Sequence, residues 1–317
     1  MVKVSVIIPV YGVEKYIERC VIALFKQTLD EIEYIFIDDC TPDNSIRIVQ
    51  KVLLNFPNRK KQVVIHKMEH NSGQAKVREW GIKNAKGEYI ASCDSDDWIS
   101  EDMYERMYNK AIEDHSDVVF CDYNLVKDEG IVIKKGFVLN AHCHNDIVEK
   151  MFSQDIPYCL WNKLIRKSLF LESDLIFPSK SHGEDMALCL QIIAVAPKIS
   201  YIEQPFYYYR YDSNTLYHNE SEKSILKKFY AVVENVSIVE NYYRKKNLEA
   251  RFSKSIMYIK LTSRDKLLPL LSLDKYYRLW KHTFSEINYK LLFNNKIKIV
   301  HKVKFLLVYT KLHLFNE

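Results

Sequence analysis

Residues 1–39, MVKVSVIIPVYGVEKYIERCVIALFKQTLDEIEYIFIDD, contain two apolar segments on either side of an amphipathic one. The apolar segments, residues 3–9 and 34–38, have the composition of buried strands. Between them, apolar side chains recur from Ile17 at positions i, i+3, i+4, i+7 and i+8, which predicts a helix. Further strands are predicted at 63–66, 88–93 and 118–121, and further helices at about 43–53, 73–85 and 101–114. This alternation predicts an α/β fold with a mostly parallel sheet and helices on both faces.

The composition fits a globular protein and excludes several other classes. The chain is 48% hydrophobic and 27% charged, and only 7 Gly and 8 Pro among 317 residues exclude a collagen-like or low-complexity chain. No apolar run is long enough to span a membrane, and the first one meets Pro9 too early for a signal peptide. The seven cysteines form no CxxC pair, so we expect reduced thiols and a cytoplasmic location.

The formal net charge of +5 is concentrated at the C-terminus. Residues 287–317 contain six lysines and one glutamate, and the balanced remainder gives no indication of nucleic-acid binding. Their spacing predicts a basic amphipathic helix, which lies on an anionic membrane, packs on the protein with a solvated lysine face, or contributes to a homodimer. Its lysines include Lys296, Lys298, Lys302, Lys304 and Lys311.

Acidic residues follow the predicted strands, at the edge where ligands bind to parallel sheets. Asp94-Ser95-Asp96-Asp97 follows one strand and Asp38-Asp39 another. Alternate carboxylates at a strand end favour Mg²⁺ or Mn²⁺ together with ligand phosphates. The alternatives are an Asp-rich turn and a phosphatase like the haloacid dehalogenases, which carry DxD on their first strand. A carboxylate of the Asp38-Asp39 pair can accept an N–H of uracil, or it can simply belong to a turn.

Three shorter segments have both a functional and a structural interpretation. Gly183-Glu184-Asp185 begins a predicted helix, where acids serve as capping groups or supply a general base. Asn71-Ser72-Gly73 leads into a helix whose Arg78 either reaches a nucleotide or lies on the surface. His142-Cys143-His144 with Asp146 has metal-ligating side chains, but adjacent side chains diverge, which favours a loop.

Three blocks of this sequence together resemble the N-terminal half of a family 2 glycosyltransferase of the GT-A fold. They are VSVIIPVYGVEKYIERCVIALFKQT, YIFIDDCTPDNS and NSGQAKVREWGIKNAKGEYIASCDSDDWIS, and the resemblance continues through LWNKLIRKSLF, HGEDMALCLQII and FYYYRYDSNT. It implies a catalytic domain at 1–215 and a helical region at 216–317. Within the first, residues 1–115 are the Rossmann-like nucleotide-sugar-binding half, and residues 116–215 are the acceptor and catalytic-base half.

The resemblance also implies a donor site at the strand ends. Asp39 is the expected partner of uracil, and Asp96 is the expected metal ligand. The usual Asn after the family's arginine is Glu79 here, so a role for that neighbour is in doubt. The implied nucleotide-sugar-binding residues are Pro9, Val10, Tyr11, Asp38, Asp39, Gly73, Arg78, Asp94, Ser95 and Asp96.

On the acceptor side, the resemblance implies that Asp185 is the catalytic base. Arg210 belongs to a segment, residues 210–213, that often closes over the nucleotide in this family. The tyrosines at 207–209 suit stacking on sugar faces, or form an aromatic core strand. The implied sugar and acceptor pocket contains Trp161, Asn162, Lys163, Glu184 and Arg210.

Together these features predict an inverting glycosyltransferase that depends on Mn²⁺ or Mg²⁺. It would move one sugar from a UDP-sugar to a glycan or lipid-linked oligosaccharide acceptor, because the QxxRW block of processive synthases is absent. The implied setting is bacterial capsular, exopolysaccharide or lipopolysaccharide synthesis, in the cytoplasm or at the inner face of the cytoplasmic membrane. The alternatives are a metal-dependent phosphatase or nucleotidyltransferase, and a non-catalytic nucleotide-sugar-binding protein.

Overall fold

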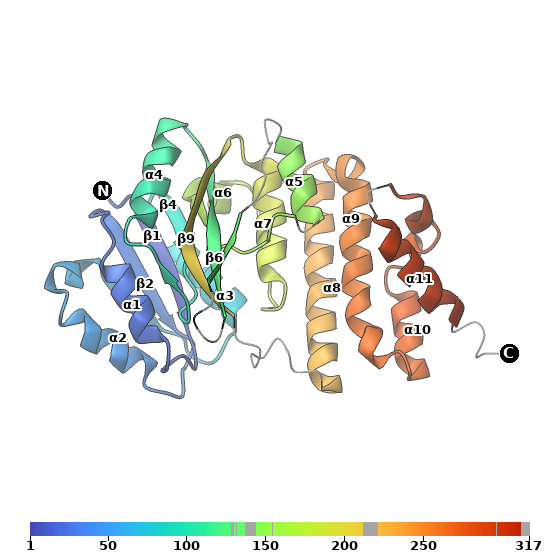
Figure 1. Ribbon diagram of the computed structural model, residues 1–317, viewed down its shortest axis with the longest axis horizontal. Coiled ribbons are helices and arrows are strands. Elements are labelled where there is room, and N and C mark those ends of the chain that lie inside the picture. The colour runs from blue at the N-terminus through green and yellow to red at the C-terminus, as the bar shows by residue number, and fades with distance from the viewer. Residues whose placement is uncertain are drawn as a thin grey trace.

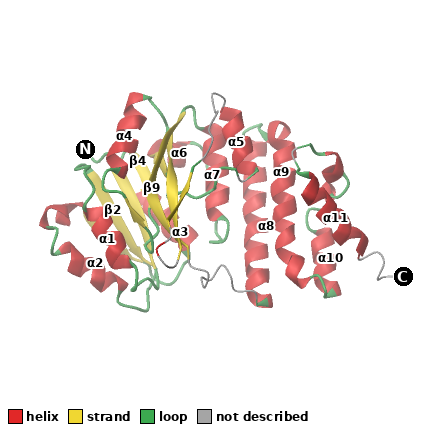
Figure 2. Cartoon of the chain, in the orientation of Figure 1, coloured by secondary structure: helices red, strands yellow, loops and turns green. Residues whose placement is uncertain are grey.

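A computed structural model describes the chain except for residues 128–129, 131, 137–143, 154, 212–220, 296 and 312–317. Within the described residues, a nine-stranded sheet with helices on both faces forms one end of the molecule, and the C-terminal helices are stacked beside it (Figure 1). Figure 2 shows the same division, with the strands gathered in one half and helices alone in the other. The strand order is β3-β2-β1-β4-β8-β6-β9-β5, and β7 pairs with β6.

The first part of the chain follows the predicted alternation of strands and helices. The sheet is parallel here, because β1 pairs in parallel with β2 and β4, and β2 pairs in parallel with β3. The elements are β1 (Val4–Val10), α1 (Ile17–Phe25), β2 (Ile32–Asp38), α2 (Ser45–Leu53), the 3₁₀ helix η1 (Pro57–Gln62), β3 (Val63–Lys67), α3 (Gln74–Asn84) and β4 (Tyr89–Ser92).

The middle of the chain adds strands of both directions. Strand β8 lies between β4 and β6 and runs antiparallel to both, whereas β9 runs parallel to β6. The sheet is therefore mixed, and its parallel character is strongest where we predicted it. The elements are β5 (Trp98–Ile99), α4 (Met103–Glu113), β6 (Val118–Lys127), β7 (Val132–Lys135), α5 (His144–Phe152), β8 (Lys163–Arg166), α6 (Lys167–Glu172), α7 (Glu184–Val195) and β9 (Ile199–Tyr211).

Two apolar cores cover the two faces of the sheet. Val6 and Ile8 of β1 share one core with α1, α2 and α4, whereas Ile7 shares the other with α3, α6 and α7. This division follows from the alternation of side chains along a strand. Gly81 lets α3 approach closely, because a Cβ there would lie 2.6 Å from Cγ2 of Ile7. The predicted two-faced covering of the sheet is confirmed.

The C-terminal helices are joined to the sheet region by a continuous core. Val236 and Tyr243 of α8 and Ile256 of α9 pack in the same cluster as α7. A separate cluster surrounds Trp280 and unites α9, α10 and α11. The domain boundary predicted at 215 lies outside the described residues. The elements are α8 (Glu222–Lys245), α9 (Glu249–Arg264), η4 (Asp265–Leu270), α10 (Asp274–His282), η5 (Ser285–Ile287), η6 (Lys290–Phe293) and α11 (Ile299–Lys311).

Across the described ranges, we find no helix with both the length and the apolarity to span a bilayer.

Candidate active site

The acidic residues predicted at the strand ends lie at one edge of the sheet. Strands β1, β2 and β4 are parallel neighbours, so their carboxyl ends meet there. The backbone N–H of Asp39 donates to the carbonyl of Val10 over 3.1 Å, which joins the ends of β1 and β2. Val10 is buried at this junction, whereas Tyr11 is half exposed beside it. The first predicted segment, Pro9 to Tyr11, therefore borders the acidic edge.

Both carboxylates of the Asp38-Asp39 pair are engaged by backbone N–H groups. The two oxygens of Asp39 accept from Ser72 over 2.7 Å and from Gly73 over 2.9 Å. Asp38 accepts from the N–H of Thr41 over 2.7 Å. Asp39 thus fixes the loop that leads into α3, and a base N–H would have to use a remaining lone pair of its carboxylate. The role of Asp39 in uracil recognition stays a prediction.

Gly73 brings two distant loops together at the start of α3. Its φ is +81°, and a Cβ there would lie 2.5 Å from Oγ of Ser181. The same Oγ accepts a hydrogen bond from the N–H of Ala75 over 3.4 Å. A side chain at position 73 would therefore be strained and would displace the hydroxyl of Ser181 from its contact with Ala75.

Arg78 of α3 is the centre of the site. Its guanidinium donates from Nη1 to Glu184 and to Asp185, each over 2.7 Å, and from Nη2 to Asp94 over 2.9 Å. The side chain is 1% exposed, so the alternative of a surface position is wrong, whereas a contact with the nucleotide stays a prediction. Gln74 adds a donor, because its Nε2 lies 3.2 Å from Oδ1 of Asp94.

The three acids around Arg78 differ in exposure. The side chain of Glu184 is 4% exposed, whereas that of Asp185 is 24% exposed and can be reached from the site. Burial raises the pKa of Glu184, as does the neighbouring charge of Asp185. Burial also raises the pKa of Asp185, against the effect of Arg78. A single guanidinium cannot neutralise three carboxylates, which favours protonation of the most enclosed of them, Glu184. The carboxylate of Asp185 faces the site.

Asp97 connects the acidic run to β9. It is buried, and its carboxylate accepts from the hydroxyl of Tyr207 and from the N–H of Arg210, each over 2.7 Å. The hydroxyl of Tyr207 in turn accepts from the N–H of Asp94 over 3.1 Å. Burial and the nearby Asp96 and Asp94 raise the pKa of Asp97 well above its ordinary value. The sequence alone predicts no role for Asp97. The feature that could have indicated one is its position directly after the DxD motif.

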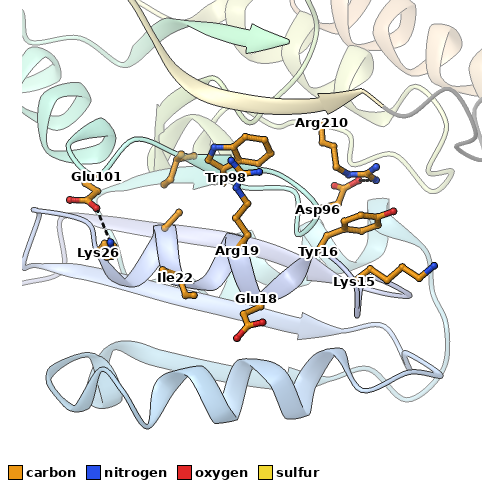
Figure 3. Close-up of a pocket in the computed structure, with 12 residues that line it drawn as sticks. Lys15, Tyr16, Glu18, Arg19, Ile22, Lys26, Asp96, Trp98, Glu101 and Arg210 are labelled. Atoms are coloured by element: carbon orange, nitrogen blue, oxygen red, sulfur yellow. Dashed lines mark hydrogen bonds and ion pairs between the residues drawn. The ribbon is translucent and has the colours of Figure 1, made fainter. Parts of the chain in front are cut away.

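Asp96 lies at the end of a cavity of about 600 Å³ between α1 and β5 (Figure 3). Arg210 extends from β9 toward it, with 3.3 Å between Nη2 and Oδ2 of Asp96, and its guanidinium lies 3.7 Å from the ring centre of Tyr16. Ser95, between the two acids, is buried. Several lining residues were not predicted: Lys15, Tyr16, Glu18, Arg19, Ile22, Ala23, Lys26, Trp98, Ile99 and Glu101.

The surroundings of Asp96 fit a divalent cation. Burial and the charge of Asp94 raise the pKa of Asp96, so a positive charge there is favourable, and Arg210 supplies one. In the described part of the chain, no group of three His, Cys, Asp or Glu side chains is arranged to hold a metal ion by itself. This agrees with Mg²⁺-type sites, in which one or two carboxylates act together with substrate phosphates. Of the cluster His142-Cys143-His144 with Asp146, residues 142 and 143 lie outside the described ranges, and residues 144 and 146 belong to α5 rather than to the favoured loop.

The block Trp161-Asn162-Lys163 is buried beneath the site. The ammonium of Lys163 donates to the carbonyls of residues 157 and 159 and to Oδ1 of Asn162, and both side chains are at most 1% exposed. The ring of Trp161 stacks on Tyr207 with 4.2 Å between centroids. These contacts support the floor of the site. Tyr207 is a core residue, whereas Tyr208 stacks on Trp98 at the cavity.

Glu79, the departure from the family pattern, faces away from the acids. Its carboxylate pairs with Lys76 over 2.8 Å and with Lys83 over 2.7 Å along α3. The position therefore has an ordinary helix-surface role in this protein.

Sequence comparison shows which protein family the first half of the chain matches. The sequence profile of the glycosyl transferase family 2 matches residues 5–171. The glycosyltransferase EpsH of Bacillus subtilis (strain 168) is 35% identical over 216 residues, which are 65% of this chain and 60% of that protein. This match thus spans less than two thirds of the relative's own length.

Structural comparison identifies the fold. Residues 1–349 of TarS from Staphylococcus aureus, in complex with UDP-GlcNAc, match with a TM-score of 0.58 and 21% identity, over 83% of this chain and 81% of that one. The mannosyltransferase PcManGT from Pyrobaculum calidifontis, in complex with GDP-Man and Mn²⁺, matches with a TM-score of 0.53 and 14% identity, over 99% and 88%. At these identities the likeness establishes the fold alone.

Proposed function

The chain belongs to glycosyltransferase family 2 and has the GT-A type of fold, and we propose that it moves one sugar from a UDP-sugar to a hydroxyl of a glycan or lipid-linked glycan. The observation that carries this proposal is the contact of one guanidinium, that of Arg78, with both Asp94 and Asp185. Sugar transfer needs a site for the departing diphosphate beside a base for the acceptor. Arg78 holds the candidate base, Asp185, beside Asp94, the first acid of the DxD motif whose Asp96 is the candidate metal ligand.

The donor would bind at the carboxyl ends of β1, β2 and β4. The loop fixed by Asp39 forms one wall, and Asp96 with Arg210 lies at the other side. The UDP-GlcNAc complex of TarS supports a uridine donor, and the GDP-Man complex of PcManGT makes guanosine the next candidate. The choice of UDP rests on TarS and on the acidic pair after β2.

A divalent cation fits the acidic edge of this site. We assign Asp96 as its protein ligand, and the Mn²⁺ in the PcManGT complex supports a divalent cation, though not a particular ligand, in this type of fold. When bound, Mg²⁺ or Mn²⁺ neutralises the charge that develops on the departing diphosphate. Arg210 faces the same carboxylate and supplies a further positive charge toward the phosphates.

Asp185 would act as the general base. Its exposed carboxylate would take the proton of the acceptor hydroxyl while that oxygen bonds to the anomeric carbon and the bond to the diphosphate oxygen breaks. A single displacement of this kind inverts the configuration at the anomeric carbon. Glu184 is enclosed and is not suited to this role, and Arg78 orients both acids.

Two other functions remain as outcomes of the test. A phosphatase or nucleotidyltransferase would use the same acidic edge and would turn over sugar phosphates or phosphate esters without a hydroxyl acceptor. A non-catalytic protein would bind a nucleotide-sugar and transfer nothing.

Bacterial surface-polysaccharide assembly is the setting we favour, because EpsH and TarS are both bacterial relatives in this comparison.

The decisive experiment combines binding and transfer with Asp185→Asn. Thermal-shift measurements with UDP, GDP, CDP and dTDP, each with and without Mn²⁺, identify the donor because bound ligand stabilises the folded state. We expect a shift with UDP and Mn²⁺, and it should survive in Asp185→Asn. Transfer from the matching nucleotide-sugar should fall roughly 10²-fold or more in that variant.

Several outcomes would count against this proposal. Equal transfer by wild type and Asp185→Asn would remove Asp185 from the mechanism. A shift with another nucleotide would replace the donor, and phosphate release that needs no acceptor would favour the phosphatase. Asp96→Ala serves as the matched control, because it should lose Mn²⁺-dependent nucleotide binding while Asp185→Asn keeps it.

A further inference from the structure

Helix α11 has two apolar faces, and only one of them is buried. Phe305 packs into the cluster around Trp280, with 5.9 Å between the ring centroids, and Val308 and Tyr309 pack against the same cluster. Five aliphatic side chains on the other face are between 41% and 77% exposed. They are Ile299, Val300, Val303, Leu306 and Leu307.

The exposed residues form one stripe along the helix. From Ile299 they occupy positions i, i+1, i+4, i+7 and i+8, which lie on a single side of an α-helix. Phe305 and Val308 fall on the opposite side. A helix that only packs on its own protein needs one apolar face, so the second stripe is not explained by the fold. Phe293, at the end of η6, is 87% exposed and precedes the helix by a few residues.

Lysines flank this stripe and no acid interrupts it. At about 100° per residue, Lys302 falls on one side of the stripe and Lys304 on the other, and Lys298 immediately precedes the helix. Lys298 and Lys304 are exposed, and Lys304 lies 3.7 Å from Asp265. Between Glu286 and Glu317 the sequence contains no acidic residue. The charged side chains of this segment itself are therefore all lysines, and Asp265 of η4 pairs with Lys304.

We propose that α11 docks the protein on the surface of an anionic lipid bilayer. The aliphatic stripe would enter the boundary between headgroups and acyl chains, and the flanking lysines would contact lipid phosphates. An apolar stripe accompanied by lysines is typical of such interfacial helices. In Figure 1, α11 lies at the outer end of the helical stack, away from β1 and β2.

A second copy of the chain fits this face less well. Two α11 stripes placed face to face would bring Lys302 and Lys304 of both copies together. The helix offers no acid to pair with them, so like charges would oppose the contact. Phosphate groups of anionic lipids provide the missing negative charge.

The test uses the full chain with vesicles of phosphatidylcholine, with and without phosphatidylglycerol. We expect flotation with the anionic vesicles and binding roughly tenfold or more weaker to the neutral ones, with further weakening at high salt. Val303→Glu/Leu307→Glu should lower binding by roughly tenfold or more. Both side chains are exposed, so the fold should persist, and thermal unfolding checks this. Leu54→Glu, at an 81% exposed leucine after α2, is the matched control and should bind as wild type.

The outcomes separate docking from catalysis and from dimerisation. Asp185→Asn should bind vesicles as wild type does, so failure of the proposed enzyme activity leaves this inference intact. Equal binding by wild type and Val303→Glu/Leu307→Glu would overturn it. A concentration-dependent dimer in light scattering that the double variant abolishes, without vesicle binding by wild type, would assign the stripe to a second copy instead.

Discussion

The two halves of the molecule each bury an arginine, and they do so in opposite ways. Arg78, in the sheet half, is surrounded by the carboxylates of Asp94, Glu184 and Asp185. Arg264, at the end of α9, lies over the ring of Trp280 at 4.1 Å and over that of Phe305 at 5.3 Å.

The consequences for charge are also opposite. The acids around Arg78 outnumber it, and burial raises the pKa of Glu184 and Asp185. Burial lowers the pKa of Arg264 to about 10, because the aromatic surroundings replace water poorly. Its Nε and Nη2 have no hydrogen-bond partner among the described residues. Burial of a charge is therefore no sign of function by itself; what matters is which groups surround it.

Replacing Arg78 should have the largest effect. Arg78→Met leaves one buried and two partly buried carboxylates without their cation, so we expect a loss of about 3–5 kcal/mol in the free energy of unfolding. Transfer should fall at least as far as in Asp185→Asn, because the base and the donor acid lose their common anchor. Urea unfolding and a transfer assay measure the two effects. A stable, active Arg78→Met would show that this cluster is ordinary packing.

Replacing Glu184 should have an intermediate effect that depends on pH. A carboxyl whose pKa is raised on folding binds extra protons in the folded state, so its contribution to stability is full at low pH and lost as pH rises. Glu184→Gln stays neutral. We expect its free energy of unfolding to equal that of wild type at acidic pH and to exceed it by about 1–2 kcal/mol at alkaline pH.

Glu79→Gln provides the control for this sign. Burial opposes its charge, but the hydrogen bonds from Lys76 and Lys83 outweigh burial and lower the pKa of Glu79. Glu79→Gln should therefore lower the free energy of unfolding slightly at neutral pH, and the difference from wild type should disappear at acidic pH. Urea unfolding of both variants at two pH values decides the matter. If the free energy of unfolding had the same pH dependence in both variants, Glu184 would not be the acid whose charged form is destabilised by folding.

Replacing Arg264 should have the smallest effect. Arg264→Met keeps a similar volume against Trp280 and removes a buried charge, so the free energy of unfolding should stay within about 1 kcal/mol of wild type. Transfer should be unchanged, because the residue belongs to the cluster of α9, α10 and α11. If activity fell as it does in Arg78→Met, the contrast between the two arginines would be false.

Several parts of the site were predicted from the sequence because their signals are local. The strand before Asp94 and the glycine before α3 were both recognised from short patterns. The parallel edge of the sheet then implied that the acids gather. What could not be predicted was that Asn162 and Lys163 support the floor, since a motif does not show whether its residues are buried.

The sequence by itself determined the α/β alternation, the acids at the strand ends and the basic amphipathic C-terminal helix. These follow from the spacing of side chains within a single strand, turn or helix. Only the tertiary structure decided that Arg78 meets Glu184 and Asp185, which lie 106 and 107 positions further along the chain. It also decided that Asp97 joins Tyr207, and which apolar face of α11 remains exposed. Such pairings depend on how the elements pack against one another, and a local sequence pattern does not contain that information.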